Sequence, residues 1–205
     1  MNITMSKFRA LRYKNRLSQK NRIGRALWGL ANALLIQPTP RWALHGWRRC
    51  LLRLFGATIG EGCRIDPTAR IWAPWNLKLG DYVALAEGCQ VYNVAPIVIG
   101  SKVAISQRCF LCTASHDIGS LQRPLTFAPI HIGNHAWVAA EALVHPGVTI
   151  GEGAVLAARG VLRRSAPDWT IWAGNPAIQV GLRKVEGSPA PGSSRPSSDE
   201  TSRSN

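Results

Sequence analysis

The chain has 205 residues, enough for one domain with short appendages. It carries 25 Lys and Arg against 11 Asp and Glu, but the excess is local, because residues 1–60 hold 12 of the basic residues and no acid. No recognised nucleic-acid-binding motif accompanies this charge. We therefore expect no nucleic-acid partner.

The basic N-terminal segment, residues 1–56, is predicted to form two helices joined by a proline turn. An apolar run covers residues 26–36, Pro38 and Pro40 follow, and residues 41–55 mix Arg with Trp and Leu. The apolar run has 11 residues, whereas roughly 20 are needed to cross a bilayer. No small-residue cleavage site follows it, so we predict neither a transmembrane helix nor a signal peptide.

Two interpretations of this segment stay open. The helices could cap the open end of the domain that follows and cover its exposed strand edge. A basic helix with Trp and Leu on its other face also suits peripheral contact with an anionic membrane surface. Both can hold in one protein, which we expect in the cytoplasm, with the inner face of the membrane as a second location.

A six-residue repeat occupies the middle of the chain. Its large aliphatic positions are Ile59, Ile65, Ile71, Leu79, Leu85, Val91, Ile99, Ile105, Leu111, Ile132, Val138, Val144, Ile150, Leu156 and Leu162. A second, mostly small position lies four residues after most of these, at Cys63, Ala69, Val83, Cys89, Val103, Cys109, Ser115, Ala136, Ala142, Val148, Ala154, Gly160 and Ala166, whereas Trp75 breaks the pattern. Such short repeats predict a parallel β-helix, whose units stack because they cannot bury their apolar faces alone. We expect a mainly β fold of about five coils over residues 57–184, with both positions pointing inward.

The repeat is interrupted once. The Ile/Leu-Gly pairs that begin at Ile59, Leu79 and Ile99 are evenly spaced, but the next pair, at Ile132, comes later than this spacing requires. We interpret the gap as a loop of about 13 residues, 117–129, inserted directly after His116. Insertions in repeat proteins map to loops on one face, which is often the binding face. His116 is therefore the candidate functional histidine.

The five cysteines do not indicate a disulfide framework. Cys63, Cys89 and Cys109 occupy the small inward position, where a thiol packs as a small hydrophobe. Cys109 and Cys112 have CxxC spacing, but no second pair completes a zinc site, so we expect no metal. Unpaired thiols are typical of a reducing cytoplasm. Residues 185–205, rich in Ser, Pro and Gly, are predicted to be a disordered tail.

Seven segments carry a resemblance to a known family. They are 51–57, 74–77, 105–117, 129–133, 136–140, 145–151 and 174–177. With these the chain resembles the hexapeptide-repeat, left-handed β-helix acetyltransferases, in the colanic acid branch of exopolysaccharide biosynthesis. The resemblance implies transfer of an acetyl group from acetyl-CoA to a hydroxyl of a sugar or saccharide acceptor. It also implies a homotrimer with sites between adjacent prisms.

The resemblance assigns roles to particular residues. His116 would be the general base, because an alcohol is a poor nucleophile at neutral pH and an imidazole can take its proton. No Ser or Cys nucleophile stands out, which favours direct attack in a ternary complex. Asn93, Asp117 and Trp137 would lie on the acceptor side, and Asp117 could also orient His116.

Five further residues are candidates for binding the coenzyme. Ala140 and Ala158 match positions where the backbone of the family approaches the pantetheine arm. Arg163, Arg164 and Arg183 could pair with the coenzyme phosphates. Around Ala158 the chain reads Ala-Ala-Arg, where related enzymes often have a glycine, and the detail of the coenzyme slot therefore stays open.

Other functions were weighed against acetyl transfer. A γ-type carbonic anhydrase has the same fold but needs three histidines that converge on a metal, and the spacing of residues 116, 131, 135 and 145 does not reproduce that arrangement. A non-catalytic scaffold or membrane-surface binding module is the alternative, against which the Ser115-His116-Asp117 motif argues. Among acyltransferases, a serine, maltose or antibiotic acceptor stays open.

Overall fold

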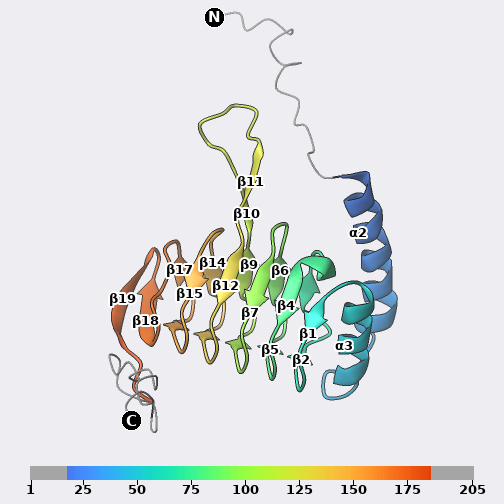
Figure 1. The fold of residues 1–205 in the computed structure, drawn as a ribbon, viewed down its shortest axis with the longest axis horizontal. Coiled ribbons are helices and arrows are strands. Elements are labelled where there is room, and N and C mark those ends of the chain that lie inside the picture. The colour runs from blue at the N-terminus through green and yellow to red at the C-terminus, as the bar shows by residue number, and fades with distance from the viewer. Residues whose placement is uncertain (1–17, 186–205) are drawn as a thin grey trace, which may run out of the picture.

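In the computed structural model, the chain forms a parallel β-helix with two helices at one end (Figure 1). The structure describes residues 18–185. Residues 1–17 and nearly all of the predicted tail lie outside the described residues.

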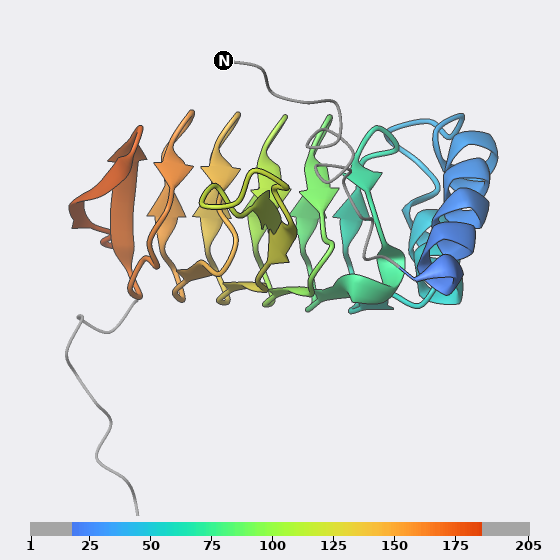
Figure 2. The same cartoon turned by 90° about the horizontal axis from the view of Figure 1, so that it is seen from above.

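Each of the first five coils contributes one short strand to each of three sheets, and the coils lie side by side along the prism in Figure 2. Sheet A contains β1 (Thr58–Ile59), β4 (Leu77–Leu79), β7 (Ile97–Ile99), β12 (Ile130–Ile132) and β15 (Thr149–Ile150). Sheet B contains β2 (Arg64–Ile65), β5 (Ala84–Leu85), β8 (Ala104–Ile105), β13 (Trp137–Val138), β16 (Val155–Leu156), β18 (Thr170–Gly174) and β19 (Ala177–Leu182). Sheet C contains β3 (Arg70–Ile71), β6 (Gln90–Tyr92), β9 (Phe110–Cys112), β14 (Leu143–Val144) and β17 (Val161–Leu162). Proline begins a short 3-10 turn, η2 (Pro74–Asn76), after β3.

The β-helix has about six coils, one more than predicted. Six strands of sheet B run parallel, and β19 then pairs antiparallel with β18. The sixth coil is shorter than the one before it. Fewer residues separate Val155 from its partner Ile171 than separate Trp137 from its partner Val155. Ala166 accordingly pairs with Ile150. The six-residue repeat no longer marks this coil, which is why the sequence pattern did not reveal it.

The core is a narrow column inside the prism. Both sets of predicted inward residues are buried, with the single exception of Ser115. Within this column the Cys89 and Cys109 thiols donate to the carbonyl oxygens of Ser106 and Ala139 in the next coil. Burial raises the pKa of Cys89 to about 12 and that of Cys109 to about 11. Both side chains are therefore neutral thiols at physiological pH and fill the core.

Two helices cover the end of the prism at which β1 and β2 lie (Figure 1). The first, α2 (Gln19–Ala31), continues into a π-helical turn, η1 (Asn32–Ile36). A loop with two prolines leads to α3 (His45–Leu54). The predicted pair of helices is confirmed, and the first begins at Gln19, ahead of the apolar run at residues 26–36.

These helices supply hydrogen-bond donors to the first coil, which has no preceding coil to pair with. Trp28 Nε1 donates to the carbonyl oxygen of Ile71 in sheet C (2.7 Å), and Arg53 Nε donates to that of Ile59 in sheet A (3.0 Å). Arg49 Nη1 donates to the carbonyl oxygen of Cys63, just before β2 of sheet B (2.9 Å). These side chains therefore end the ladder of hydrogen bonds on all three sides of the prism. The geometry matches the capping interpretation of this segment.

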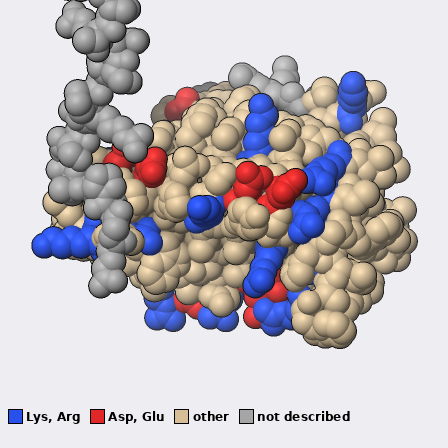
Figure 3. Space-filling model, turned by 60° about the horizontal axis from the view of Figure 1, so that its bottom comes forward, with Lys and Arg blue, Asp and Glu red and all other residues tan. Residues whose placement is uncertain are grey.

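Charges on the prism itself are mixed in sign. On the face shown in Figure 3, acidic side chains lie beside basic ones on a largely uncharged surface. Glu141, for example, pairs with Arg108 and, through Oε2, with Arg159 Nε at 2.6 Å. The hydrogen bonds from Arg159 and Arg108 hold the pKa of Glu141 below its usual value. The uncompensated positive charge of the chain thus belongs to the N-terminal segment.

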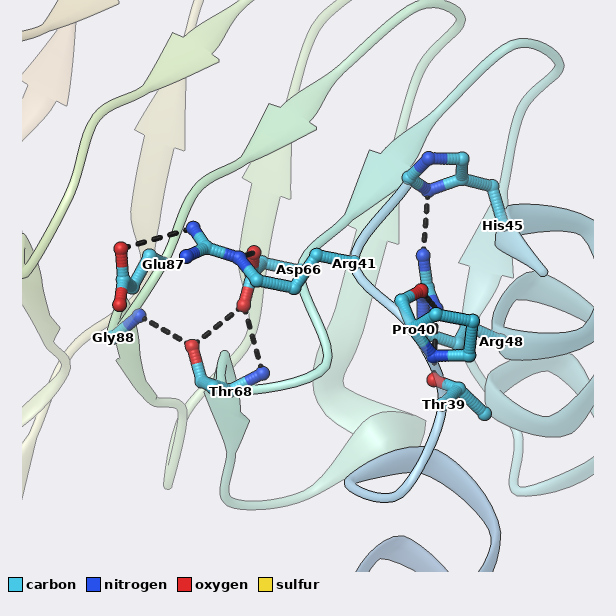
Figure 4. A network of polar contacts seen from close by, with 9 residues as sticks. All are labelled: Thr39, Pro40, Arg41, His45, Arg48, Asp66, Thr68, Glu87 and Gly88. Atoms are coloured by element: carbon cyan, nitrogen blue, oxygen red, sulfur yellow. Dashed lines mark hydrogen bonds and ion pairs between the residues drawn. The ribbon is translucent and has the colours of Figure 1, made fainter. Parts of the chain in front are cut away.

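Polar contacts fix the loop between the helices (Figure 4). Arg41 pairs with Asp66 and Glu87 on the first two coils, at 2.9 Å in each case. Arg48 is buried and donates to His45 Nδ1 at 2.8 Å. Because arginine only donates hydrogen bonds, His45 accepts through Nδ1 and its ring is neutral. Burial, and then the charge of Arg48, lower the pKa of His45.

The interruption of the repeat is a β-hairpin, β10 (Ala114–His116) paired with β11 (Leu125–Phe127), which projects from the prism (Figure 1). The strand register confirms the predicted size of the insertion. More residues separate Ile97 from its partner Ile130 than separate Leu77 from its partner Ile97, and the excess equals the predicted length of the loop. The predicted starting point is wrong. Ser115 was expected to point inward, but it belongs to β10 and is exposed.

Candidate active site

The prism has three edges, along which the corner residues of successive coils stack. In the fourth coil these corners are residues 133–136 between sheets A and B, residues 139–142 between sheets B and C, and residues 145–148 between sheets C and A. We call them the A–B, B–C and C–A edges. The hairpin leaves the prism at the C–A edge, because it follows β9 of sheet C and precedes β12 of sheet A.

Thr113 anchors the hairpin to the prism. Its buried hydroxyl donates to the Tyr92 carbonyl oxygen at 2.9 Å and accepts from the Ala95 amide at 3.0 Å. Its own carbonyl accepts from the amide of Ala128, at the other foot of the hairpin, at 2.9 Å. Both feet are therefore tied to the coil beneath. The six-residue repeat does not reveal the role of Thr113, because nothing in the repeat distinguishes a threonine at this place.

His116 ends β10 and is exposed at the base of the hairpin loop. Its Nδ1 lies 2.7 Å from the carbonyl oxygen of Arg123, across the hairpin. A carbonyl only accepts hydrogen bonds, so Nδ1 carries the proton in this contact. In the neutral ring the lone pair is then on Nε2. The hairpin thus holds His116 in the tautomer that a general base acting through Nε2 requires.

Asp117 follows β10 at the start of the hairpin loop. Its carboxylate Oδ1 accepts from the Gly119 amide at 2.9 Å, a turn-stabilising contact within the hairpin loop. The His116 ring is itself hydrogen-bonded to the Arg123 carbonyl, and an orienting role for Asp117 stays a prediction. A short exposed Asp two residues before a glycine is a common turn residue, and the sequence could have suggested the contact with Gly119.

Asn93 is a structural residue in this fold. Its side chain is wholly buried, its Oδ1 accepts from the Ala73 amide at 2.9 Å, and its Nδ2 donates to the Ala73 carbonyl at 2.7 Å. Both ends of its amide therefore serve the backbone of the preceding coil. The expected contact of Asn93 with an acceptor is not supported by this geometry, because the side chain does not reach the surface.

Trp137 lies on the outer face of sheet B and is half exposed. Its Nε1 donates to the Ser106 hydroxyl of the neighbouring coil at 2.9 Å. Sheet B lies across the prism from the C–A edge that carries the hairpin. Within one chain, the fold therefore does not bring Trp137 and His116 to the same edge.

Arg163 and Arg164 share the C–A edge with His116. They follow β17, two coils beyond the coil that carries the hairpin, and both are exposed. Between them and the hairpin lies the corner that begins at His145. Burial, and then the charge of Arg163, lower the pKa of His145, so that its ring is neutral at pH 7. This edge combines two imidazole rings and two cations.

The other three coenzyme candidates lie on different edges. Ala140 and Ala158 occupy the B–C edge in successive coils, and Ala140 also lines a pocket of about 400 Å³ that includes Arg70 and Arg108. Arg183 lies at the A–B edge, where its Nη1 donates to the carbonyls of residues 135 and 153 at 2.8 and 3.0 Å. The predicted coenzyme set is therefore not assembled within one chain.

No protein-family model matches the chain. Among curated proteins, it is 41% identical over 163 residues to the putative colanic acid biosynthesis acetyltransferase WcaF of Escherichia coli K12, which covers 80% of this chain and 89% of that protein. A putative acetyltransferase of Schizosaccharomyces pombe is 34% identical over 125 residues, covering 60% of this chain and 59% of that protein.

Solved structures show the same fold. The hexapeptide-repeat acetyltransferase of Vibrio cholerae in complex with acetyl-CoA superposes with a TM-score of 0.75 at 24% identity, covering 88% of this chain and all of that chain. A galactoside acetyltransferase in complex with coenzyme A gives a TM-score of 0.70 at 20% identity, covering 89% and 92% of the two chains. At these identities the likeness concerns the fold alone.

Proposed function

Because the chain belongs to the hexapeptide-repeat acetyltransferases of the colanic acid biosynthesis type, we propose that it transfers the acetyl group of acetyl-CoA to a saccharide hydroxyl, with His116 as general base. The observation that carries the proposal is the hydrogen bond between His116 Nδ1 and the carbonyl of Arg123. It fixes the tautomer in which Nε2 can accept a proton.

Catalysis then needs two proton movements through one ring. Nε2 of His116 takes the proton of the acceptor hydroxyl while the oxygen attacks the thioester carbonyl of acetyl-CoA. The C–O bond forms, the tetrahedral intermediate collapses, and the C–S bond breaks. The imidazolium returns the proton to the sulfur of coenzyme A. The acetyl group passes directly to the acceptor, without an acyl-enzyme.

For the coenzyme, the proposal places Arg163 and Arg164 at its phosphates, because these cations lie on the same edge as His116. Two solved structures with the same fold support acetyl-CoA as the donor, since one is a complex with acetyl-CoA and the other a complex with coenzyme A. The name of the curated relative supports an acceptor from exopolysaccharide biosynthesis. A cytoplasmic location fits the donor and the five free cysteines of the chain.

We further propose that the working unit is a homotrimer with sites between neighbouring prisms. Trp137, Ala140 and Ala158 lie on sheet B or its following edge, away from His116 of the same chain. They can meet His116 only across a contact between copies. Such a site would also shield the exposed face of sheet B near Trp137.

The test is coenzyme A release from acetyl-CoA with candidate saccharides as acceptors. We compare the wild type with His116→Ala and His116→Asn, of which the second keeps a donor for the Arg123 carbonyl. Loss of the base should lower kcat by about 10²- to 10⁴-fold in both variants. Equal rates in wild type and variants would refute the role of His116. No release with any saccharide would favour a non-catalytic scaffold.

A further inference from the structure

Helix α2 and the turn η1 that continues it carry an apolar stripe that faces away from the prism, with Leu34 in η1. Ile23, Leu27, Leu30 and Leu34 follow one another at spacings of four, three and four residues, which places them on one side of a helix. Their exposures are 62, 58, 61 and 64%, whereas Trp28, on the opposite side of α2, is 3% exposed. The helix therefore buries one apolar face and presents a second one outward.

A stripe of this kind is costly in water. Four large aliphatic side chains in a row form a contiguous apolar surface, and soluble proteins rarely leave such surfaces uncovered unless they bind something. A capping role does not require the stripe, because the cap uses Trp28 and the arginines of α3. The outward face of α2 needs another explanation.

The charge around the stripe identifies its partner. Lys20 and Arg22 belong to the same helix and are exposed, and residues 1–60 contain 12 basic residues and no acid. An apolar stripe with a basic surround is the pattern of helices that lie in the surface of an anionic bilayer. No helix in the described part of the chain is long and apolar enough to cross a membrane. The pattern thus indicates a helix that lies on the bilayer.

A second copy of the chain is a poorer occupant. Two copies that met through α2 would bring two basic segments together without any acid in residues 1–60 to compensate them. Like charges across an interface disfavour association. Anionic headgroups supply the missing negative charge, and the acyl chains supply the apolar phase.

We propose that α2 binds the surface of an anionic membrane, with Ile23, Leu27, Leu30 and Leu34 among the lipid chains and Lys20 and Arg22 at the headgroups. The inference stands independently of the acetyl-transfer proposal. It places the end of the prism that carries α2 and α3 against the membrane.

Vesicle flotation with the full-length protein tests this. Phosphatidylcholine vesicles are compared with equal mixtures of phosphatidylcholine and phosphatidylglycerol, at low and high salt. The wild type should float only with the anionic vesicles, and less at high salt. Leu27→Ser with Leu30→Ser should weaken the partitioning by roughly tenfold or more. Lys20→Glu with Arg22→Glu should weaken it roughly fivefold per residue or more.

A matched control lies at the other end of the prism. Ile178 and Leu182 on β19 are 63 and 51% exposed, so Ile178→Ser with Leu182→Ser removes a similar apolar surface. This variant should float like the wild type. Failure of the wild type to bind anionic vesicles would overturn the proposal. So would unchanged flotation of the Leu27/Leu30 variant, or a loss that light scattering traces to a changed oligomeric state. Because the readout is binding, a failure of acetyl transfer does not affect it.

Discussion

At the scale of single residues, the site depends on contacts that the backbone makes. His116 could be selected from the sequence because a break in a regular repeat is visible in the spacing of Ile and Leu. Its partner could not, since the Arg123 carbonyl is a backbone group that any residue at that position would supply. The side-chain oxygens of Asn93 and Asp117 likewise accept hydrogen bonds from nearby backbone N–H groups, and the sequence pattern does not specify these contacts.

His45 gives a prediction at this scale. Its pKa is lowered in the folded protein, first by burial and then by the charge of Arg48. The unfolded chain therefore binds a proton more readily, and the free energy of unfolding should fall as the pH drops below about 6.5, levelling once the folded histidine is also protonated. Urea unfolding measured about every half pH unit between pH 8 and pH 5 gives the dependence of the unfolding free energy on pH.

The control is His45→Gln, which keeps an acceptor for Arg48 without a titrating ring. Its unfolding free energy should depend less on pH over the same range. Some dependence should persist, because the pKa of His145 is lowered in the same direction. An unchanged slope would contradict the role assigned to His45.

At the scale of the coil, the fold follows from a repeat of one large and one small side chain. The repeat was enough to predict the prism, and each predicted inward residue except Ser115 is indeed buried. The sixth coil and the start of the hairpin could not, because both are changes of register. A shortened coil and a strand that turns outward at Ala114 leave the local composition unchanged.

The corners give a second prediction. Gly153 has a φ of +64°, and a Cβ there would lie 2.4 Å from the Trp169 ring of the next coil. Gly153→Ala should therefore lower the free energy of unfolding by about 1–3 kcal/mol. Gly29→Ala is the matched change, because a Cβ at Gly29 in α2 meets nothing within 4 Å. It should raise the free energy by about 0.5–1 kcal/mol, since alanine favours helix. Thermal unfolding of both variants decides, and equal effects would contradict the packing at Gly153.

At the scale of the whole molecule, candidate residues are divided among three edges. His116, Arg163 and Arg164 share one edge, Ala140 and Ala158 lie on a second, and Arg183 lies on the third. Trp137 lies on the face of sheet B. A single prism therefore does not bring all the candidate site residues to one place. The resemblance to the family suggested shared sites, and the edges explain physically why sharing would be needed.

Mixed oligomers test the sharing. Chains with His116→Ala are co-expressed with chains that carry Trp137→Ala, and the hybrids are purified through two different affinity tags. In a shared site, one contact of the hybrid joins a wild-type His116 to a wild-type Trp137, so coenzyme A release should exceed that of either parent. As a control, chains with both substitutions are co-expressed with wild-type chains. Hybrid activity equal to the mean of the parents would place each site within one chain.

The two ends of the prism also decide how far the β-helix can grow. A stack of identical coils has an open edge at each end, and two such edges from different molecules could join into a fibre. At one end Trp28, Arg49 and Arg53 already occupy carbonyl oxygens that an incoming coil would need. At the other end β19 runs antiparallel to β18, which breaks the parallel pattern of the stack. Both ends of the stack therefore disfavour the addition of further coils, and with it the end-to-end polymerisation of the protein.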